Sequence, residues 1–163
     1  MELLKRPKSL FIICPECHIE KLIEHEYGEN IIFLSALGGE YQFGSMDDYE
    51  EVLQLISCEN IDHLYIVNAC NCSFIENVTS GKKFKNTLVE ETLNDLYFEH
   101  IEDFLKIEDS KEKTRILVNL FFETQGRKLL STPFLGHKIE SGELKCDGIF
   151  IDDNKNLNVI TIH

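Results

Sequence analysis

Residues 62–73 read DHLYIVNACNCS, and this stretch decides the fold. Its first part, Asp62 to Val67, is a short run rich in β-branched and aromatic residues, which is typical of a buried strand. Cys70 and Cys72 follow where that strand should end. Open α/β sheets bind ligands at the carboxyl ends of their strands. The sequence therefore predicts two thiols at the edge of a sheet where function is usually found.

A second cysteine pair has the same arrangement. Ser9 to Ile13 is another apolar run, and Cys14-Pro15-Glu16-Cys17 follows it directly. The carboxyl ends of neighbouring parallel strands meet at one edge, so thiols far apart in the chain could meet there on one soft metal ion. A Cys-x-x-Cys pair together with a Cys-x-Cys pair predicts a metal site.

The remaining pattern alternates strands with helices. It predicts an α/β domain with an open, mostly parallel sheet and helices on both faces, because helical crossovers join the parallel strands. We expect one domain over residues 1–163. A polar stretch at 79–86 predicts an exposed loop. Helices are expected at 16–27, from Asp47 onward, at 88–107, at 111–130 and from Thr132-Pro133 to Gly142, and further strands at 31–37, 143–151 and 157–162.

Composition limits the partners of the chain. The 29 acidic residues outnumber the 16 basic ones, which gives a formal charge of -13. Such a charge repels phosphate backbones and anionic lipids, so we expect no nucleic-acid and no membrane partner. Residues 1–8 lack the features of a signal peptide, and no segment approaches the roughly 20 apolar residues of a membrane span. These features predict a cytoplasmic protein, where the six cysteines are thiols, metal ligands or buried residues such as Cys58 and Cys146.

The order of these parts resembles a β-class carbonic anhydrase of the short type. In that family one strand ends in Cys-x-Asp-x-Arg, a second leads into an Ala-Gly loop, and a third ends in His-x-x-Cys-Gly. The similar stretches here are CPECH at 14–18, IIFLSALGG at 31–39 and residues 62–73, and the tail at 132–135 and 141–152 is similar to the last helix and strand of the family. The resemblance implies zinc as cofactor, carbon dioxide or bicarbonate as substrate, and a homodimer.

The resemblance also implies roles for single residues. Aligned on His63, Cys14 and Cys72 take the positions of the two zinc-ligating cysteines, and Ala69 takes the place of the ligating histidine. Glu16 and His18 stand where the family has its Asp-Arg pair, and so would position the attacking water. Alternatively, Glu16 only favours the first turn of a helix by its charge.

Ala69 leaves one ligand unassigned, and either Cys70 or Cys17 could supply it. Three cysteines and a water would leave an open position for chemistry. Four thiols would form a closed tetrahedral site, which is typically structural. Alternatively, Cys17 faces away on its helix and Cys70 packs in the core.

Three functions follow from these alternatives. The first is a zinc-dependent lyase or hydrolase that acts on carbon dioxide or a similarly small molecule. The second is a catalytically inactive relative with a structural thiolate zinc site and a partner-binding role. The third is a thiol redox or persulfide protein, because Cys14 at a strand-to-helix junction lies where backbone N–H groups stabilise a thiolate.

Three phenylalanines are candidates for the dimer contact that the resemblance implies. Phe121, Phe122 and Phe134 could pack against a second subunit, or they could belong to the ordinary core.

Overall fold

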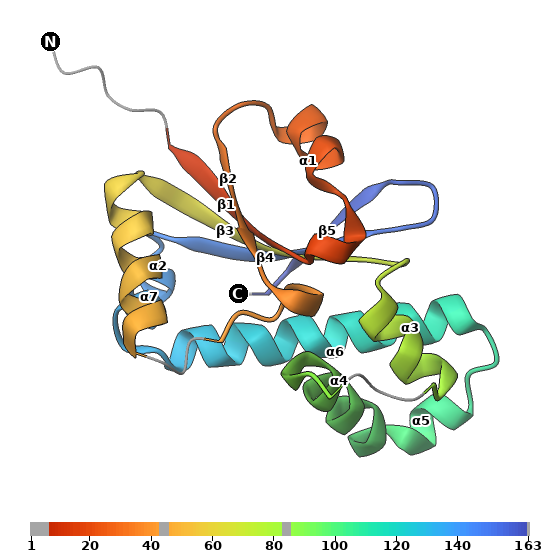
Figure 1. Cartoon of the computed structure of the whole chain (residues 1–163). Coiled ribbons are helices and arrows are strands. Elements are labelled where there is room, and N and C mark those ends of the chain that lie inside the picture. Colours follow the sequence, from red (N-terminus) through yellow and green to blue (C-terminus); the bar gives the residue numbers. More distant parts are fainter. Residues whose placement is uncertain (1–6, 43–45, 83–85, 163) are drawn as a thin grey trace, which may run out of the picture.

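A five-stranded sheet forms the centre of the protein (Figure 1). The computed structural model describes residues 7–42, 46–82 and 86–162. The strand order is β2-β1-β3-β4-β5; β2, β1, β3 and β4 are parallel, and β5 runs antiparallel to β4. The strands span Lys8–Ile13 (β1), Ile31–Ser35 (β2), Ile61–Ala69 (β3), Lys145–Ile151 (β4) and Leu157–Thr161 (β5). The predicted open, mostly parallel sheet is confirmed.

Helices cover both faces of the sheet, as expected. From β1 the chain moves one way along the sheet to β2, and from β2 it moves the opposite way to β3. Right-handed crossovers therefore put α1 and α2 on opposite faces, and Figure 1 shows α1 on one side and the other helices on the opposite side. The helices span Glu20–Tyr27 (α1), Met46–Cys58 (α2), Ser73–Ser80 (α3), Leu88–Glu99 (α4), Ile101–Leu105 (α5), Ser110–Ser131 (α6) and Pro133–Glu140 (α7).

The core lies between the sheet and α6. Leu10 and Phe11 on β1 and Leu64 on β3 are 0 % exposed, because these inner strands are covered on both faces. Phe121 and Phe122 on α6 are also 0 % exposed. These two phenylalanines therefore belong to the core and are not free to form a subunit contact.

One glycine of β4 makes the close approach of α6 possible. A Cβ atom at Gly148 would lie 2.4 Å from Cδ2 of Phe122. Such a separation is far below van der Waals contact, so the Phe122 ring occupies the space that a side chain at this position would need.

Two expectations about helices were wrong in detail. No helix was predicted where α3 lies, although its Phe74, Ile75 and Val78 are buried at helical spacing. The predicted loop at 79–86 overlaps the end of this helix, and residues 83–85 of that loop lie outside the described residues. The predicted single helix at 88–107 is two helices, because the backbone leaves the helical conformation at His100 (φ -113°, ψ 23°).

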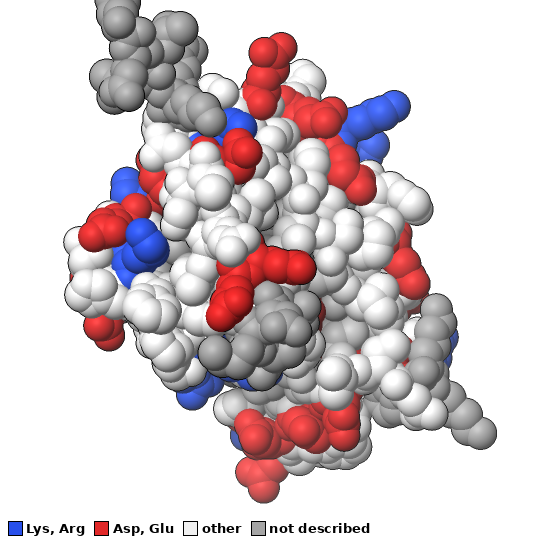
Figure 2. All heavy atoms as spheres, turned by 60° about the vertical axis from the view of Figure 1, so that its left-hand side comes forward, with Lys and Arg blue, Asp and Glu red and all other residues white. Residues whose placement is uncertain are grey.

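Acidic side chains are prominent on the surface. Figure 2 shows Asp and Glu spread over the visible face, with fewer Lys and Arg among them. This distribution agrees with the formal charge of -13. Of the helices in the described parts of the chain, none combines the length and the apolar character that a bilayer crossing requires.

Candidate metal centre

Three cysteines from two separate stretches meet at the carboxyl edge of the sheet. The sulfur atoms of Cys14, Cys17 and Cys72 all lie within 4.8 Å of one another. Their residues are 0 %, 5 % and 1 % exposed. The predicted meeting of Cys14 with Cys72 is thus present in the structure, and Cys17 joins them.

The backbone explains how these sulfurs converge. Cys14 follows the last residue of β1, and Pro15–Cys17 forms one turn of 3-10 helix in which the Cys17 N–H donates to the Cys14 carbonyl oxygen at 3.1 Å. Cys72 follows β3, the neighbour of β1, and its N–H donates to the Ala69 carbonyl oxygen at 3.0 Å. Two tight turns on adjacent strands therefore bring the three side chains to one point.

Hydrogen bonds within the cluster divide the thiols into unlike groups. Cys17 and Cys72 donate to the Cys14 sulfur, with help from the backbone amides of Gly38 and Glu16, and so hold the pKa of Cys14 well below its usual range. The same contact with Cys14 raises the pKa of Cys17 strongly and that of Cys72 to about 11. The three sulfurs thus form one hydrogen-bonded group in which the Cys14 sulfur accepts from both of the others, and Cys17 and Cys72 are also in contact with each other.

The loop after β2 also approaches the cluster, because the backbone amide of Gly38 contacts Cys14. Gly38 has a left-handed backbone (φ 62°), which glycine adopts readily. A Cβ atom there would also lie 2.4 Å from Cγ2 of Val89 on α4. Both the conformation and the space therefore favour glycine at the position whose amide faces Cys14.

The donor set suits a zinc ion. Sulfurs at the corners of a tetrahedron with Zn–S bonds near 2.3 Å are about 3.8 Å apart. Sulfurs already within 4.8 Å of one another reach that geometry by small side-chain movements. Three sulfur donors are also one short of the four that close a structural site, so a coordination position would stay open.

Ala69 and Cys70 take different places around the cluster. Ala69 is 1 % exposed at the end of β3, and its methyl group cannot ligate a metal. Cys70 is half-buried, and its N–H donates to the Ile151 carbonyl oxygen at 2.9 Å. Burial and a hydrogen bond to Asp153 raise the pKa of Cys70 to about 11. Of the four thiols predicted as ligands, the structure brings together Cys14, Cys17 and Cys72, while Cys70 lies beside Asp153. Of the two cysteines expected to be buried, Cys146 is buried, but the expectation for Cys58 was wrong, because this residue is exposed at the end of α2.

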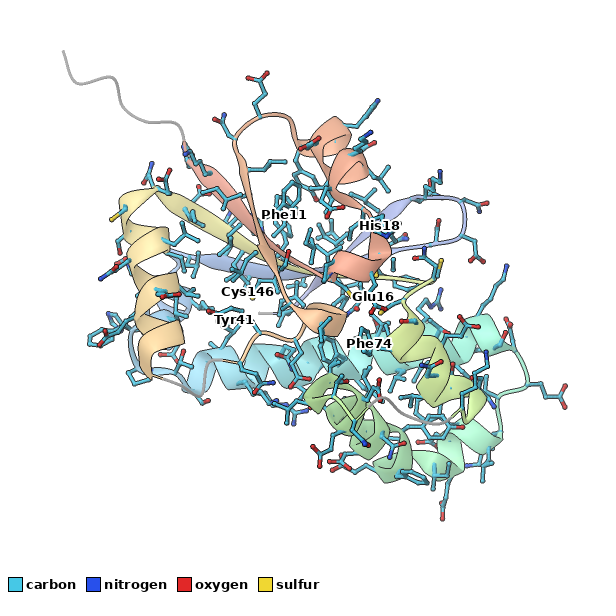
Figure 3. All side chains as sticks on the ribbon, viewed as in Figure 1. Phe11, Glu16, His18, Tyr41, Phe74 and Cys146 are labelled. Atoms are coloured by element: carbon cyan, nitrogen blue, oxygen red, sulfur yellow. The ribbon has the colours of Figure 1, made fainter. Side chains whose placement is uncertain are left out.

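Glu16 and His18 have separate surroundings. The Ser73 hydroxyl at the start of α3 donates to Oε2 of Glu16 at 2.7 Å. Figure 3 shows Glu16 on the side of Phe74, and His18 on the side of the β4–β5 turn. Within the described ranges no hydrogen bond joins the two side chains. No local pattern points to Ser73 as a partner of Glu16, because the two residues are 57 positions apart.

The helix predicted from residue 16 is interrupted at His18. The 3-10 turn ends there in a left-handed conformation (φ 51°, ψ 47°), and α1 begins at Glu20. Histidine is one of the few residue types that adopt this conformation with some frequency. The break turns Cys17 inward and leaves His18 exposed.

A cavity of about 600 Å³ adjoins the cluster. It lies between α1, the end of β3 and the turn that joins β4 to β5. Cys17 and Ala69 belong to its wall, and Ile19, Leu22 and Ile151 add apolar surface. The cavity therefore reaches the thiol cluster on the side where Ala69 presents only a methyl group.

Solved structures of β-carbonic anhydrases share this fold. The β-carbonic anhydrase CafA of Aspergillus fumigatus is 13 % identical, covers 98 % of this chain and 77 % of its own, and has a TM-score of 0.79. The wild-type CafD enzyme of the same fungus is 16 % identical over 96 % of this chain and 90 % of its own, with a TM-score of 0.76. A tetrameric β-carbonic anhydrase of Sordaria macrospora is 15 % identical over 94 % and 80 %, with a TM-score of 0.75.

The likeness to these proteins is one of fold. No model of a known protein family matches the sequence, and no curated protein matches it either. At 13–16 % identity the comparison supports the architecture, while the chemistry has to be argued from the cluster itself.

Proposed function

We propose that this protein is a zinc-binding relative of the β-carbonic anhydrases in which Cys14, Cys17 and Cys72 hold the ion. The observation that carries the proposal is the convergence of three buried sulfurs within 4.8 Å at the carboxyl edge of a sheet with this fold. The proposed reaction is the hydration of carbon dioxide or of a similarly small molecule.

In the proposed site a sulfur from Cys17 takes the place of the histidine ligand that the resemblance puts at position 69. Ala69 provides no donor atom, and Cys17 contributes a third sulfur from the neighbouring turn. A bound zinc ion would supply a Lewis acid that lowers the pKa of a water in its fourth position to about 7. Thiolate ligands suit zinc better than hard cations such as magnesium, which prefer oxygen.

Glu16 is the proposed group that orients the attacking water. Its carboxylate is exposed at the 3-10 turn between two of the proposed ligands, and the Ser73 hydroxyl holds one oxygen. The second oxygen can accept a hydrogen bond from a water molecule bound to the metal, as carboxylates beside metal ligands do. His18, exposed beside the cavity, is the proposed group that exchanges protons with solvent.

A structural zinc site is the alternative function. It requires Cys70 as a fourth sulfur, and this side chain would have to leave Asp153 and turn toward Cys72. The three-sulfur arrangement favours the open site over this alternative.

Thiol redox chemistry is the other alternative, and the cluster itself gives it support. The Cys14 thiolate accepts a hydrogen bond from the Cys17 thiol, so a nucleophilic sulfur and a possible disulfide partner are adjacent. The metal analysis described below distinguishes this function from the two metal functions. A redox protein would contain the three cluster sulfurs without one bound metal ion per chain.

A homodimer in the cytoplasm completes the proposal. The tetrameric enzyme of Sordaria macrospora has the same fold, which supports self-association. Phe134, 67 % exposed at the start of α7, is the one of the three candidate phenylalanines that is available for a subunit contact.

Metal analysis and X-ray absorption test the site directly. We expect one zinc per chain in protein purified under reducing conditions, with three sulfurs and one lighter atom around it. Cys17→Ser should lower zinc affinity roughly 100-fold or more, while Cys70→Ser and the exposed Cys58→Ser serve as matched controls. Four sulfurs around zinc would favour the structural site, and no zinc would overturn both metal functions.

Stopped-flow hydration of carbon dioxide tests the reaction. Zinc-loaded protein should accelerate hydration above the buffer rate, and Glu16→Ala should reduce that acceleration. Zinc-loaded protein that matches buffer would remove the lyase function while leaving the metal site intact.

A further inference from the structure

The cavity beside Cys17 is larger than the proposed reaction needs. Its volume is about 600 Å³, whereas carbon dioxide and bicarbonate have only three or four heavy atoms. Cavities of roughly 300–1,000 Å³ are typical sites for small organic molecules. Ile19, at 6 % exposure, and Ile151, at 4 %, give it buried apolar wall next to Cys17.

The acidic residues of this cavity are already engaged. Asp152 accepts hydrogen bonds from the backbone amides of Asn154 and Asn156, both at 2.9 Å, which hold its pKa below the usual range. Asp153 forms an ion pair with Lys111 at 2.6 Å. The Asp152 carboxylate therefore stabilises the β4–β5 turn. The Asp153 carboxylate joins that turn to α6.

The two lysines of the cavity lack such partners. Lys21 on α1 and Lys155 in the β4–β5 turn line it, and in the described part of the chain neither forms an ion pair. The imidazoles of His18 and His25 lie on the same wall as Lys21. In the described part of the chain, two lysines without an ion-pair partner face one carboxylate without one, Asp152, so this cavity has a small excess of positive charge on a chain of formal charge -13.

We propose that the cavity bounded by Cys17, Ala69, Lys21 and Lys155 binds a small organic anion that carries carboxylate groups. Its carboxylates pair with the two lysines, and its carbon skeleton lies against Ile19, Leu22 and Ile151. The site adjoins the cluster through Cys17, so the ligand lies next to the proposed zinc ligands. This binding does not depend on the metal, because every named contact comes from side chains of the cavity.

An NMR titration with succinate tests the proposal. Succinate should produce saturable shifts in the amide resonances of 19–25 and 151–155 in both metal-free and zinc-loaded protein. The double variant Lys21→Glu/Lys155→Glu should weaken binding roughly tenfold, since it removes both ion pairs with the ligand and reverses the charge at each position. The matched control is Lys82→Glu/Lys106→Glu, which changes the net charge equally at two exposed lysines outside the cavity.

Each outcome decides the proposal. Retained affinity in the control together with weakened affinity in the cavity variant supports it. An absence of saturable shifts overturns it, as does equal weakening in both double variants, which would show general charge attraction. Zinc binding without succinate binding contradicts this proposal alone, and succinate binding by a protein that takes up no zinc contradicts the metal proposal alone.

Discussion

The backbone N–H of Cys17 donates to the carbonyl oxygen of Cys14 at 3.1 Å, and this bond closes the turn that brings their sulfurs together. Pro15 begins the turn with its backbone angle already fixed, and the left-handed His18 ends it. The third sulfur of the cluster thus comes from the same short segment as the first. A metal site of this kind needs no donor from position 69.

Exchange of the third donor is testable in a double variant. Cys17→Ala should lose most of its zinc affinity, and adding Ala69→His should recover at least about tenfold of it. The cavity borders Ala69, so an imidazole has space to enter. Competition with a chromophoric chelator measures both affinities.

The control for this rescue is Cys17→Ala/Ala69→Leu, which adds similar bulk without a donor atom. Equal zinc affinity in the histidine and leucine variants would contradict the exchange. Cobalt substitution gives a second measurement, because the sulfur-to-metal charge-transfer bands should weaken when two sulfurs replace three.

The hydrogen bond from Ser73 to Glu16 predicts a positioning effect on the proposed reaction. Ser73→Ala removes the donor and leaves the carboxylate free to rotate. We expect kcat for carbon dioxide hydration to fall about three- to tenfold, as for the loss of one ordinary hydrogen bond, with zinc content unchanged. Ser80→Ala is the control, since its hydroxyl donates to the Glu76 carbonyl oxygen instead. A normal rate in Ser73→Ala beside a low rate in Glu16→Ala would leave Ser73 without a role.

Burial of Cys146 predicts a loss of stability at alkaline pH. Desolvation on β4 raises the pKa of this thiol to about 12, above its unfolded value near 9. Between these values the unfolded chain releases the proton and the folded chain keeps it. The free energy of unfolding should therefore fall by about 1 kcal/mol per pH unit from this thiol alone as pH rises from 9 to 12.

Denaturant titrations of metal-free protein at several pH values measure this slope. Cys146→Ala should be less stable at pH 8 and should have a shallower pH slope than wild type. The exposed Cys58→Ala should keep the wild-type slope. Parallel curves for Cys146→Ala and wild type would refute the assignment.

The contact between Gly148 and Phe122 predicts a coupled pair of substitutions. Gly148→Ala places a Cβ atom 2.4 Å from the Phe122 ring and should cost about 1–3 kcal/mol of unfolding free energy. Phe122→Leu vacates part of that space, so the double variant should be more stable than the sum of the single effects. Phe121→Leu is the control partner, since the close contact involves Phe122. If the effects of the single substitutions simply add both in the Gly148/Phe122 pair and in the Gly148/Phe121 pair, the contact is contradicted.

The strands, and the approach of the Cys14 and Cys72 side chains, were predictable because local sequence patterns determine where the strands end. Apolar runs end at Ile13 on β1 and near Val67 on β3, so the positions of Cys14 and Cys72 followed from strand length and sheet order. The choice between Cys17 and Cys70 was not predictable in the same way. It depends on the left-handed turn at His18 and on the contact of Cys70 with Asp153, and both are set by tertiary packing.

Helix α3, which was not predicted from the sequence, had a readable signal. Phe74, Ile75 and Val78 lie at helical spacing between Ser73 and Gly81, and the lysines and glycine after Thr79 obscured that stripe. By contrast, nothing local links Glu16 with Ser73, because the contact exists only once β1 and β3 are neighbours.

The depth of the thiol cluster determines how an ion can arrive. Cys14 and Cys72 are 0 % and 1 % exposed, so chelators in solution have no direct contact with either sulfur. Release of an ion held by these two sulfurs requires a local opening of the turns that carry them. Loading is therefore easiest while the chain is still being synthesised and folded, and removal from the finished molecule would proceed at the pace of that local opening, whatever the equilibrium affinity.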